Sequence, residues 1–267
     1  MISGEQLVFD FFRTSNVDFD FENFLVGSKN SEVFSILKAW SSGREDKMVY
    51  VWGESSVGKT HLLQSALKTI EERSIYIPLK KIKNLEPSSL DGLAEVGVLA
   101  LDDVDSLAGK ADFEESLFNL FNSVVSKGAR LLLSATNHPS RQGFILKDLI
   151  SRLNSHSVYK VWQLTDHEKI QALALMAERK GIIADGTVWA YVLRKSRRDM
   201  TSLVFLLKGN VLLSKPHEAA IFMAEGKKNI SLIEKSSLGE FLEATQELNL
   251  KVKIVDTIRG YNIAKGR

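Results

Sequence analysis

The feature that most constrains the fold is the run GESSVGKT, residues 53–60, between the apolar segment MVYVW and the segment KTHLLQSALKTIEER. The segment before it reads as a buried strand, and the segment after it (59–73) has the apolar spacing of a helix. A G-x-x-x-x-G-K-[ST] run in this context forms a loop whose backbone N–H groups surround a phosphate chain. The sequence therefore predicts a nucleotide-binding loop made of Gly53, Glu54, Ser55, Ser56, Val57, Gly58, Lys59 and Thr60.

Two side chains of this loop have separate predicted roles. Lys59 is expected to neutralise the β and γ oxygens of the nucleotide, and the Thr60 hydroxyl is expected to ligate Mg²⁺. The helix that begins near Lys59 directs the positive end of its dipole at the same phosphates. The expected cofactors are therefore ADP or ATP together with Mg²⁺, and the sequence does not choose between the two nucleotides.

Two carboxylates end the nearly continuous apolar segment VGVLALDDV, residues 96–104. Asp102 is placed to hold Mg²⁺ directly or through water, so Thr60 and Asp102 are the predicted metal ligands. Asp103 is a candidate to orient or deprotonate the attacking water, and a loop cap is the competing interpretation.

Three further polar residues are candidates for contact with the γ-phosphate. Asn137 follows the apolar segment ARLLLSAT (129–136), where it can sense or position water, although an Asn before a turn is usually a turn residue. Arg152 in DLISRL and Arg198 in SRRDM are candidates for cations that meet the γ-phosphate, either from the chain's own lid or from a neighbouring subunit, although an isolated Arg more often lies on the surface.

Strands are expected at residues 48–53, 74–79, 96–104, 129–136 and 157–164. Their alternation with helix-like segments predicts an α/β fold with a doubly wound parallel sheet and a ligand at the carboxyl ends of its strands. After Leu164 the strand pattern fades. Thr165 and Glu168 form a predicted capping box at the start of a helix (165–181), and two more helices are expected at 185–196 and 198–214. The expected organisation is a leader (1–16), a nucleotide-binding α/β domain (17–164), a helical lid (165–235) and an extension of unclear role (236–267), in which residues 250–258 alternate like an isolated strand.

Composition narrows the function classes. The chain has no Cys, which excludes disulfides and thiol catalysis, and its five His lack the spacing of a zinc site. It shows neither a secretory signal nor an apolar run of the roughly 20 residues that cross a bilayer, so a cytoplasmic protein without membrane contact is expected. A formal net charge of +2 gives weak support for broad attraction to nucleic acid.

The motifs together resemble the DnaA/Hda family of AAA+ proteins. The resemblance rests on FDFENFLVGSKN (19–30), GKTHLLQS, the long segment 99–139 that contains LDDVDSL and SATNHP, DLISRL (148–153) and RRDMTSL (197–203). It implies an AAA+ domain with a helical lid. By position it also implies the roles given above for Lys59, Thr60, Asp102 and Asp103, and it makes Asn137 the first sensor. Arg152 would then reach a neighbour's nucleotide as an arginine finger, and Arg198 would contact the nucleotide from its own lid. His61, counted with the nucleotide-binding residues, would pack rather than catalyse, and residues 19–30 would form the entry segment on the adenine side.

The leader contains EQLVFDFF, residues 5–12. Gln6, Leu7, Phe9 and Phe11 resemble the short peptide by which partners dock on the DNA polymerase sliding clamp, with Phe9 where Leu is usual. An extended segment of this kind buries apolar side chains in a pocket while the Gln amide fixes the register. Because the apolar residues alternate with period two, an edge strand is the competing interpretation.

Within the family, the chain most resembles the regulatory inactivator. No basic recognition helix follows the lid helices, so sequence-specific DNA binding is not expected. The resemblance implies a regulator that binds the sliding clamp (the β subunit of DNA polymerase III) and stimulates hydrolysis of DnaA-bound ATP, which prevents re-initiation, with weak intrinsic hydrolysis. A homo-oligomer is left open. The alternatives are a self-sufficient AAA+ ATPase or helicase loader, and an initiator-like DNA-binding protein.

Overall fold

The computed structural model describes residues 19–44, 47–179, 186–195, 197–208, 211–213, 218–221 and 251–252. The chain divides into two compact units between Gln163 and Leu164. The predicted clamp-binding segment, including Gln6, Leu7, Phe9 and Phe11, lies outside the described residues.

The first unit is built on a five-stranded sheet in the order β2-β3-β4-β1-β5, and every neighbouring pair is parallel. The strands are β1 (Met48–Trp52), β2 (Ser74–Pro78), β3 (Val98–Asp102), β4 (Arg130–Ala135) and β5 (Ser157–Lys160). The central strands β1, β3 and β4 are mostly apolar, which suits strands that are covered on both faces. The predicted parallel α/β fold is confirmed.

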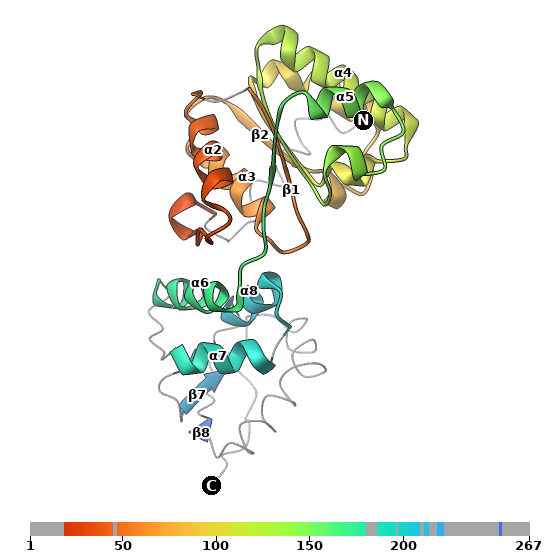
Figure 1. Cartoon of the computed structure of the whole chain (residues 1–267). Helices are drawn as coiled ribbons and strands as arrows, with labels where there is room; N and C mark the ends of the chain where they lie inside the picture. The colour runs from red at the N-terminus through yellow and green to blue at the C-terminus, as the bar shows by residue number, and fades with distance from the viewer. Residues whose placement is uncertain are drawn as a thin grey trace, which may run out of the picture. The chain divides into compact units, whose positions relative to one another are not determined.

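Helices cover both faces of this sheet (Figure 1). On one face α2 (Ser31–Ser41) and α3 (Lys59–Lys68) pack against Val49 and Val51 of β1. On the other face α4 (Ala111–Lys127) and α5 (Lys147–Asn154) pack against the side chains that alternate with these, such as Tyr50. The period-two alternation of the strands therefore divides the apolar residues into two cores.

The strand order brings three functional segments together. β1 lies between β4 and β5, and β4 lies between β1 and β3. The pairs Trp52↔Ala135 and Leu101↔Leu133 show that β1, β4 and β3 end at nearly the same level. Since neighbouring strands are about 4.8 Å apart, the segments that follow them lie side by side at one edge.

Some predicted boundaries in this unit are wrong. The helix predicted over 59–73 ends at Lys68, where the Thr69 hydroxyl donates to the Ala66 carbonyl at 2.9 Å and competes with the helical pattern. The strand expected over 157–164 is regular only in β5, because the chain then leaves the sheet. Helix α2 had not been assigned from the sequence.

The second unit contains three helices, α6 (Asp166–Glu178), α7 (Gly186–Lys195) and α8 (Met200–Lys208), in the part of it that is described. The capping box of Thr165 and Glu168 is present at the start of α6. The prediction of a helix through residue 214 is wrong, because Val211–Leu213 forms strand β6, which pairs antiparallel with β7 (Glu218–Ile221). Strand β8 (Lys251–Val252) pairs with β7, so it is not isolated.

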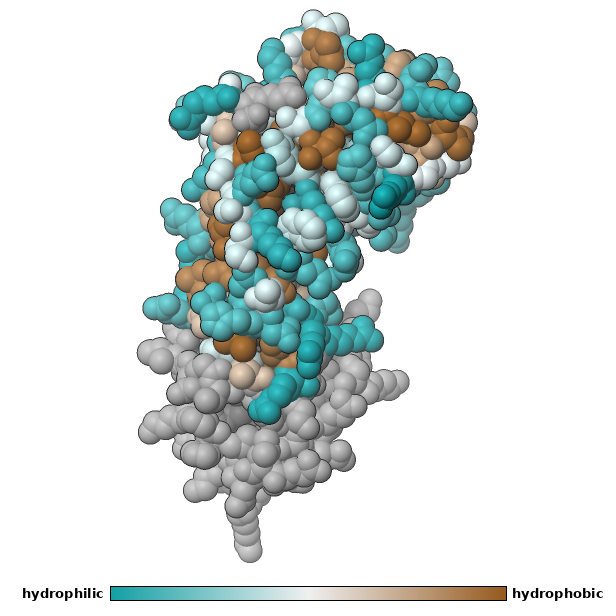
Figure 2. All heavy atoms as spheres, viewed as in Figure 1, coloured by the Kyte–Doolittle hydropathy of each residue, from teal (hydrophilic) through white to brown (hydrophobic). Residues whose placement is uncertain are grey.

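The surface is mixed in character. Hydrophilic and hydrophobic residues are interspersed on the visible face of the described residues (Figure 2). None of the described helices combines the length and the apolar character that a membrane span requires.

Asn30 ties the start of α2 to the chain beyond β5. It is 1% exposed, its amide donates to the Trp162 carbonyl at 3.0 Å, and its Oδ1 accepts from the Trp162 N–H at 2.8 Å. We predict that Asn30→Ala lowers the free energy of unfolding by about 1–3 kcal/mol, because both backbone groups of Trp162 lose their partner. Urea denaturation measures this loss. Asn119→Ala on the exposed face of α4 is the control, and an equal loss there would contradict the assignment.

Candidate nucleotide site

The loop between β1 and α3 has two glycines that no other residue can replace without strain. Gly58 has φ of 99°, and a Cβ there would lie 2.8 Å from Cε2 of Phe24. A Cβ on Gly53 would lie 2.3 Å from the carbonyl oxygen of Val161. The backbone therefore turns tightly into the N-terminus of α3, where N–H groups and the helix dipole favour an anion.

Lys59 is buried in the same loop. Its Nζ donates to the carbonyl oxygens of Gly53 at 2.7 Å and Glu54 at 2.8 Å. Burial lowers the pKa of Lys59, and the carboxylates of Asp103 and Asp102 partly oppose that shift. The ammonium group is thus held among the backbone groups of the loop that is predicted to carry phosphate.

Asp102 is the centre of the polar network at this edge, and it is only 2% exposed. Its Oδ2 accepts hydrogen bonds from the hydroxyls of Thr60 at 2.6 Å and Tyr76 at 2.7 Å. The Ser134 hydroxyl donates to Oδ1. Burial, and then the charge of Asp102, raise the pKa of Tyr76, which keeps this phenol protonated as a donor.

The two predicted metal ligands are therefore in direct contact. A threonine hydroxyl beside a carboxylate, next to a phosphate-binding loop, is a donor set that fits Mg²⁺. Thr60 and Asp102 would hold this ion, which would supply positive charge to the β and γ phosphates.

Asp103 adopts the left-handed conformation, with φ of 59°, and its N–H donates to the Ser134 hydroxyl at 3.0 Å. Burial raises the pKa of its carboxyl, and the neighbouring charges of Asp102 and Asp105 raise it further. A raised pKa brings a carboxyl closer to the range in which it can exchange a proton with water near neutral pH.

The segment after β4 contains a second network, which had not been predicted. Asn137 is exposed, and its backbone N–H donates to Oε1 of Gln142 at 2.7 Å. The Thr136 hydroxyl donates to Oδ2 of Asp105 at 3.1 Å, which joins this segment to the one after β3. Asp105 was visible in the sequence only as a third acidic residue in DDVD, and Gln142 gave no signal.

His61 packs against the segment 19–24. Its ring meets Phe19 and Phe24 edge to face, with centroids 5.0 and 5.3 Å apart, and its Nε2 lies 2.8 Å from the Asp20 carbonyl oxygen. Burial lowers the pKa of His61. The imidazole therefore joins α3 to the segment that was predicted to lie on the adenine side.

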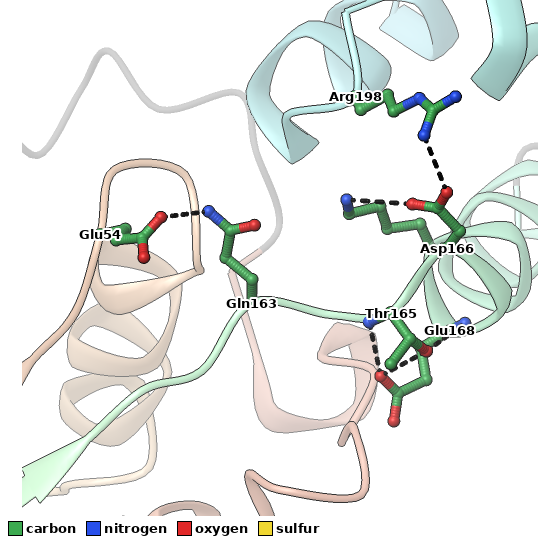
Figure 3. Close-up of polar contacts among 7 residues, drawn as sticks. Glu54, Gln163, Thr165, Asp166, Glu168 and Arg198 are labelled. Carbon is green, nitrogen blue, oxygen red and sulfur yellow. Dashed lines mark hydrogen bonds and ion pairs between the residues drawn. The ribbon is translucent and has the colours of Figure 1, made fainter.

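The two candidate arginines have different surroundings. Arg152 is exposed in the last turn of α5, and in the described part of the chain it forms no ion pair. Arg198, in the second unit, is exposed and pairs with Asp166 at 3.3 Å (Figure 3).

Gln163 donates to Glu54 of the predicted loop within the first unit (Figure 3).

An open hollow of about 820 Å³ lies at the opposite edge of the sheet. Its lining includes Lys47, Gly97 and Arg130, which precede or begin strands β1, β3 and β4. Two ion pairs are formed among its lining residues, Arg130 with Glu72 and Lys127 with Glu95. Because parallel strands place the ends that follow Trp52 and Asp102 at the other edge, this hollow does not belong to the nucleotide site.

The fold and the loop define a P-loop nucleotide-binding protein of the AAA+ class. Residues 15–159 match the family described as the bacterial DnaA ATPase domain, and the chain belongs to that family. An uncharacterized protein of Haemophilus influenzae is 34% identical over 190 residues, which are 70% of this chain and 82% of that protein.

Solved structures agree on the fold. Domain III of DnaA from Thermotoga maritima has a TM-score of 0.64 at 24% identity, covering 72% of this chain and 87% of that one. AMPPCP-bound DnaA from Aquifex aeolicus has a TM-score of 0.60 at 20% identity, covering 87% of this chain and 70% of that one.

We predict that His61 makes stability depend on pH. Its folded pKa lies below the ordinary value of 6.5, so its stabilising contribution is complete above that value and is lost as the pH falls through it. Between about pH 7.5 and about pH 5.5, the free energy of unfolding should fall more steeply for the parent than for His61→Phe. Urea denaturation at each pH measures this, and His167→Gln on the exposed face of α6 controls for the loss of an imidazole. Parallel pH profiles for the parent and His61→Phe would contradict the prediction.

Proposed function

We propose that this chain is a regulator of bacterial replication initiation that holds ADP or ATP and stimulates hydrolysis of ATP bound to DnaA. The observation that carries the proposal is the exposed Arg152 on α5, which no ion pair occupies in the described residues, on a domain of the DnaA ATPase family. A free guanidinium on a rigid helix is suited to act on a phosphate that another chain holds.

The chain's own nucleotide has a structural role in this proposal. The N–H groups of the loop and Lys59 would bind the phosphates, and Arg198 would contact the nucleotide from the second unit. Asp103 and Asn137 would position water for weak intrinsic hydrolysis. The bound nucleotide would thereby stabilise the domain that presents Arg152.

Arg152 would act as an arginine finger in trans. A guanidinium is always charged and offers several N–H donors in one plane, so it stabilises the charge that develops on the γ-phosphate in the transition state. Such a residue contributes about 10³–10⁵ in rate where it has been measured in other systems.

The leader would restrict this activity to the neighbourhood of the sliding clamp. Docking would occur through Gln6, Leu7, Phe9 and Phe11. It would raise the effective concentration of this chain near partners at the clamp. The same tether would link inactivation of DnaA to DNA that has been replicated.

We predict that Arg152→Ala lowers the stimulated rate of DnaA ATP hydrolysis by about 10³-fold or more, because the transition state loses its cation. Nucleotide binding by the chain itself should not change, since Arg152 is remote in sequence from the loop and lies on another helix. Release of phosphate from DnaA preloaded with labelled ATP measures the rate, and calorimetry measures nucleotide binding.

Arg44→Ala provides the matched control for that experiment, because Arg44 is an exposed arginine outside α5. Normal stimulation by Arg152→Ala would exclude the finger role. Robust turnover by the chain without DnaA would favour the self-sufficient ATPase instead, for which the raised pKa of Asp103 is the supporting observation.

We also predict that Gln6→Ala abolishes capture of the purified sliding clamp in a pulldown, because the amide that fixes the register of the docking peptide is lost. Asn16→Ala, in the same leader but outside the motif, should capture the clamp normally. Undiminished capture by Gln6→Ala would favour the edge-strand interpretation.

A further inference from the structure

Glu114 in the first turn of α4 is a carboxylate with 0% of its surface exposed. Moving a charged carboxylate out of water is costly unless hydrogen bonds replace those of water. No ion pair involves Glu114 in the described part of the chain. Its two oxygens must therefore be satisfied by neutral hydrogen-bond donors.

Those donors are three backbone N–H groups. Gly109 donates to Oε1 at 2.7 Å, and Leu146 donates to Oε2 at 2.7 Å. Ile145 donates to both oxygens, at 3.2 Å to Oε1 and 2.9 Å to Oε2. One side chain thus joins the loop before α4 to the segment before α5, 31 residues further along the chain.

The carboxylate lies at the beginning of two helices. It belongs to the first turn of α4, and it accepts from Leu146, the N-cap residue of α5, whose own side chain makes no capping bond. A carboxylate at a helix N-terminus satisfies free N–H groups and interacts favourably with the dipole. Glu114 therefore holds, from α4, the backbone of the two residues that lead into α5.

The segment that Glu114 holds carries an exposed apolar side chain. Ile145 is 61% exposed, although its backbone N–H is bonded to a buried group. A fixed apolar residue loses little freedom when a partner covers it, which is the property of an interface anchor. Ile145 immediately precedes Leu146, the N-cap residue of α5, and Arg152 lies in the last turn of that helix.

The same helix offers charge complementarity to a triphosphate. Lys147 and Arg152 are both exposed on α5 and outnumber its single carboxylate, the exposed Asp148. Neither cation forms an ion pair in the described residues. A partner that holds a triphosphate beside an apolar recess would match this combination of cations and Ile145. A wholly apolar partner surface would leave the two cations without compensation.

We propose that Ile145 and the exposed face of α5 form the surface that docks on the nucleotide-holding face of ATP-loaded DnaA, and that Glu114 is the positioning residue that sets this surface. The inference rests on the proposed function, because the occupant is the chain whose ATP Arg152 would reach. Ile145 contributes affinity, Arg152 acts on the phosphate, and Glu114 fixes the start of the helix that carries Arg152.

The first test replaces the anchor. Ile145→Ser should raise the concentration of this chain that half-saturates stimulation of DnaA by about tenfold and leave the saturated rate unchanged, because burial of one aliphatic side chain is lost. Val125→Ser on α4 is the matched control, since Val125 is also an exposed aliphatic residue, at 52%. Binding of ATP-loaded DnaA is measured separately by calorimetry.

The second test replaces the positioning residue. Glu114→Gln keeps the shape but turns one acceptor into a donor that faces N–H groups. The saturated stimulated rate should fall by about 10- to 100-fold, because a small misplacement of a catalytic group has an effect of that size. Nucleotide binding by the chain's own loop should be unchanged, which separates misplacement of α5 from general loss of folding. A saturated rate equal to that of the parent would overturn the positioning role.

The outcomes distinguish the inference from the function on which it rests. If the parent stimulates DnaA and Ile145→Ser is indistinguishable from it, the docking surface is wrong while the function stands. If the parent binds DnaA without stimulating it and Ile145→Ser binds more weakly, the finger role is wrong and the surface is supported. If the parent does not bind DnaA, or if Ile145→Ser only dissociates copies of this chain from one another, the docking proposal is overturned.

Discussion

The buried carboxylate of Asp102 is the interaction on which the nucleotide site depends. It accepts hydrogen bonds from the hydroxyls of Thr60 at the start of α3, Tyr76 in β2 and Ser134 in β4. These partners come from separate elements, so one side chain fixes the relative positions of the loop and three strands. All of these partners are neutral hydroxyls, and the contact of Thr60 with Asp102 brings together the two residues that would hold Mg²⁺.

The parts of the fold that were predicted from the sequence are those that local pattern specifies. The run from Gly53 to Thr60 is contiguous, and its strand-loop-helix context is visible within a few residues on either side. The central strands β1, β3 and β4 were predicted because strands buried on both faces are nearly continuously apolar. The capping box of Thr165 and Glu168 was predicted for the same reason, since its two members are three residues apart.

The parts that were not predicted depend on contacts between distant segments. Nothing in the sequence near Glu114 shows that its partners are the N–H groups of Ile145 and Leu146. The links from Thr136 to Asp105 and from Asn30 to Trp162 also join segments that only the strand order brings together. The wrong assignment of Val211–Leu213 has a related cause. A short apolar run can form a helix or a strand depending on its tertiary contacts, and here it pairs with β7 as a strand.

Asp102 and Glu114 are both carboxylates that are buried without a cationic partner in the described residues, and they have different roles in the proposed mechanism. Each is a buried carboxylate compensated by neutral donors, hydroxyls for Asp102 and backbone N–H groups for Glu114. Replacing either carboxylate by an amide would turn one acceptor into a donor that faces other donors, and an unsatisfied buried donor costs more than the lost hydrogen bond itself. Asp102 ends β3 below the nucleotide loop, whereas Glu114 joins the N-termini of α4 and α5. The binding of the chain's own nucleotide therefore depends on Asp102, and the position of Arg152 depends on Glu114. A substitution of Asp102 can impair nucleotide binding without displacing α5, and a substitution of Glu114 can displace α5 without impairing nucleotide binding.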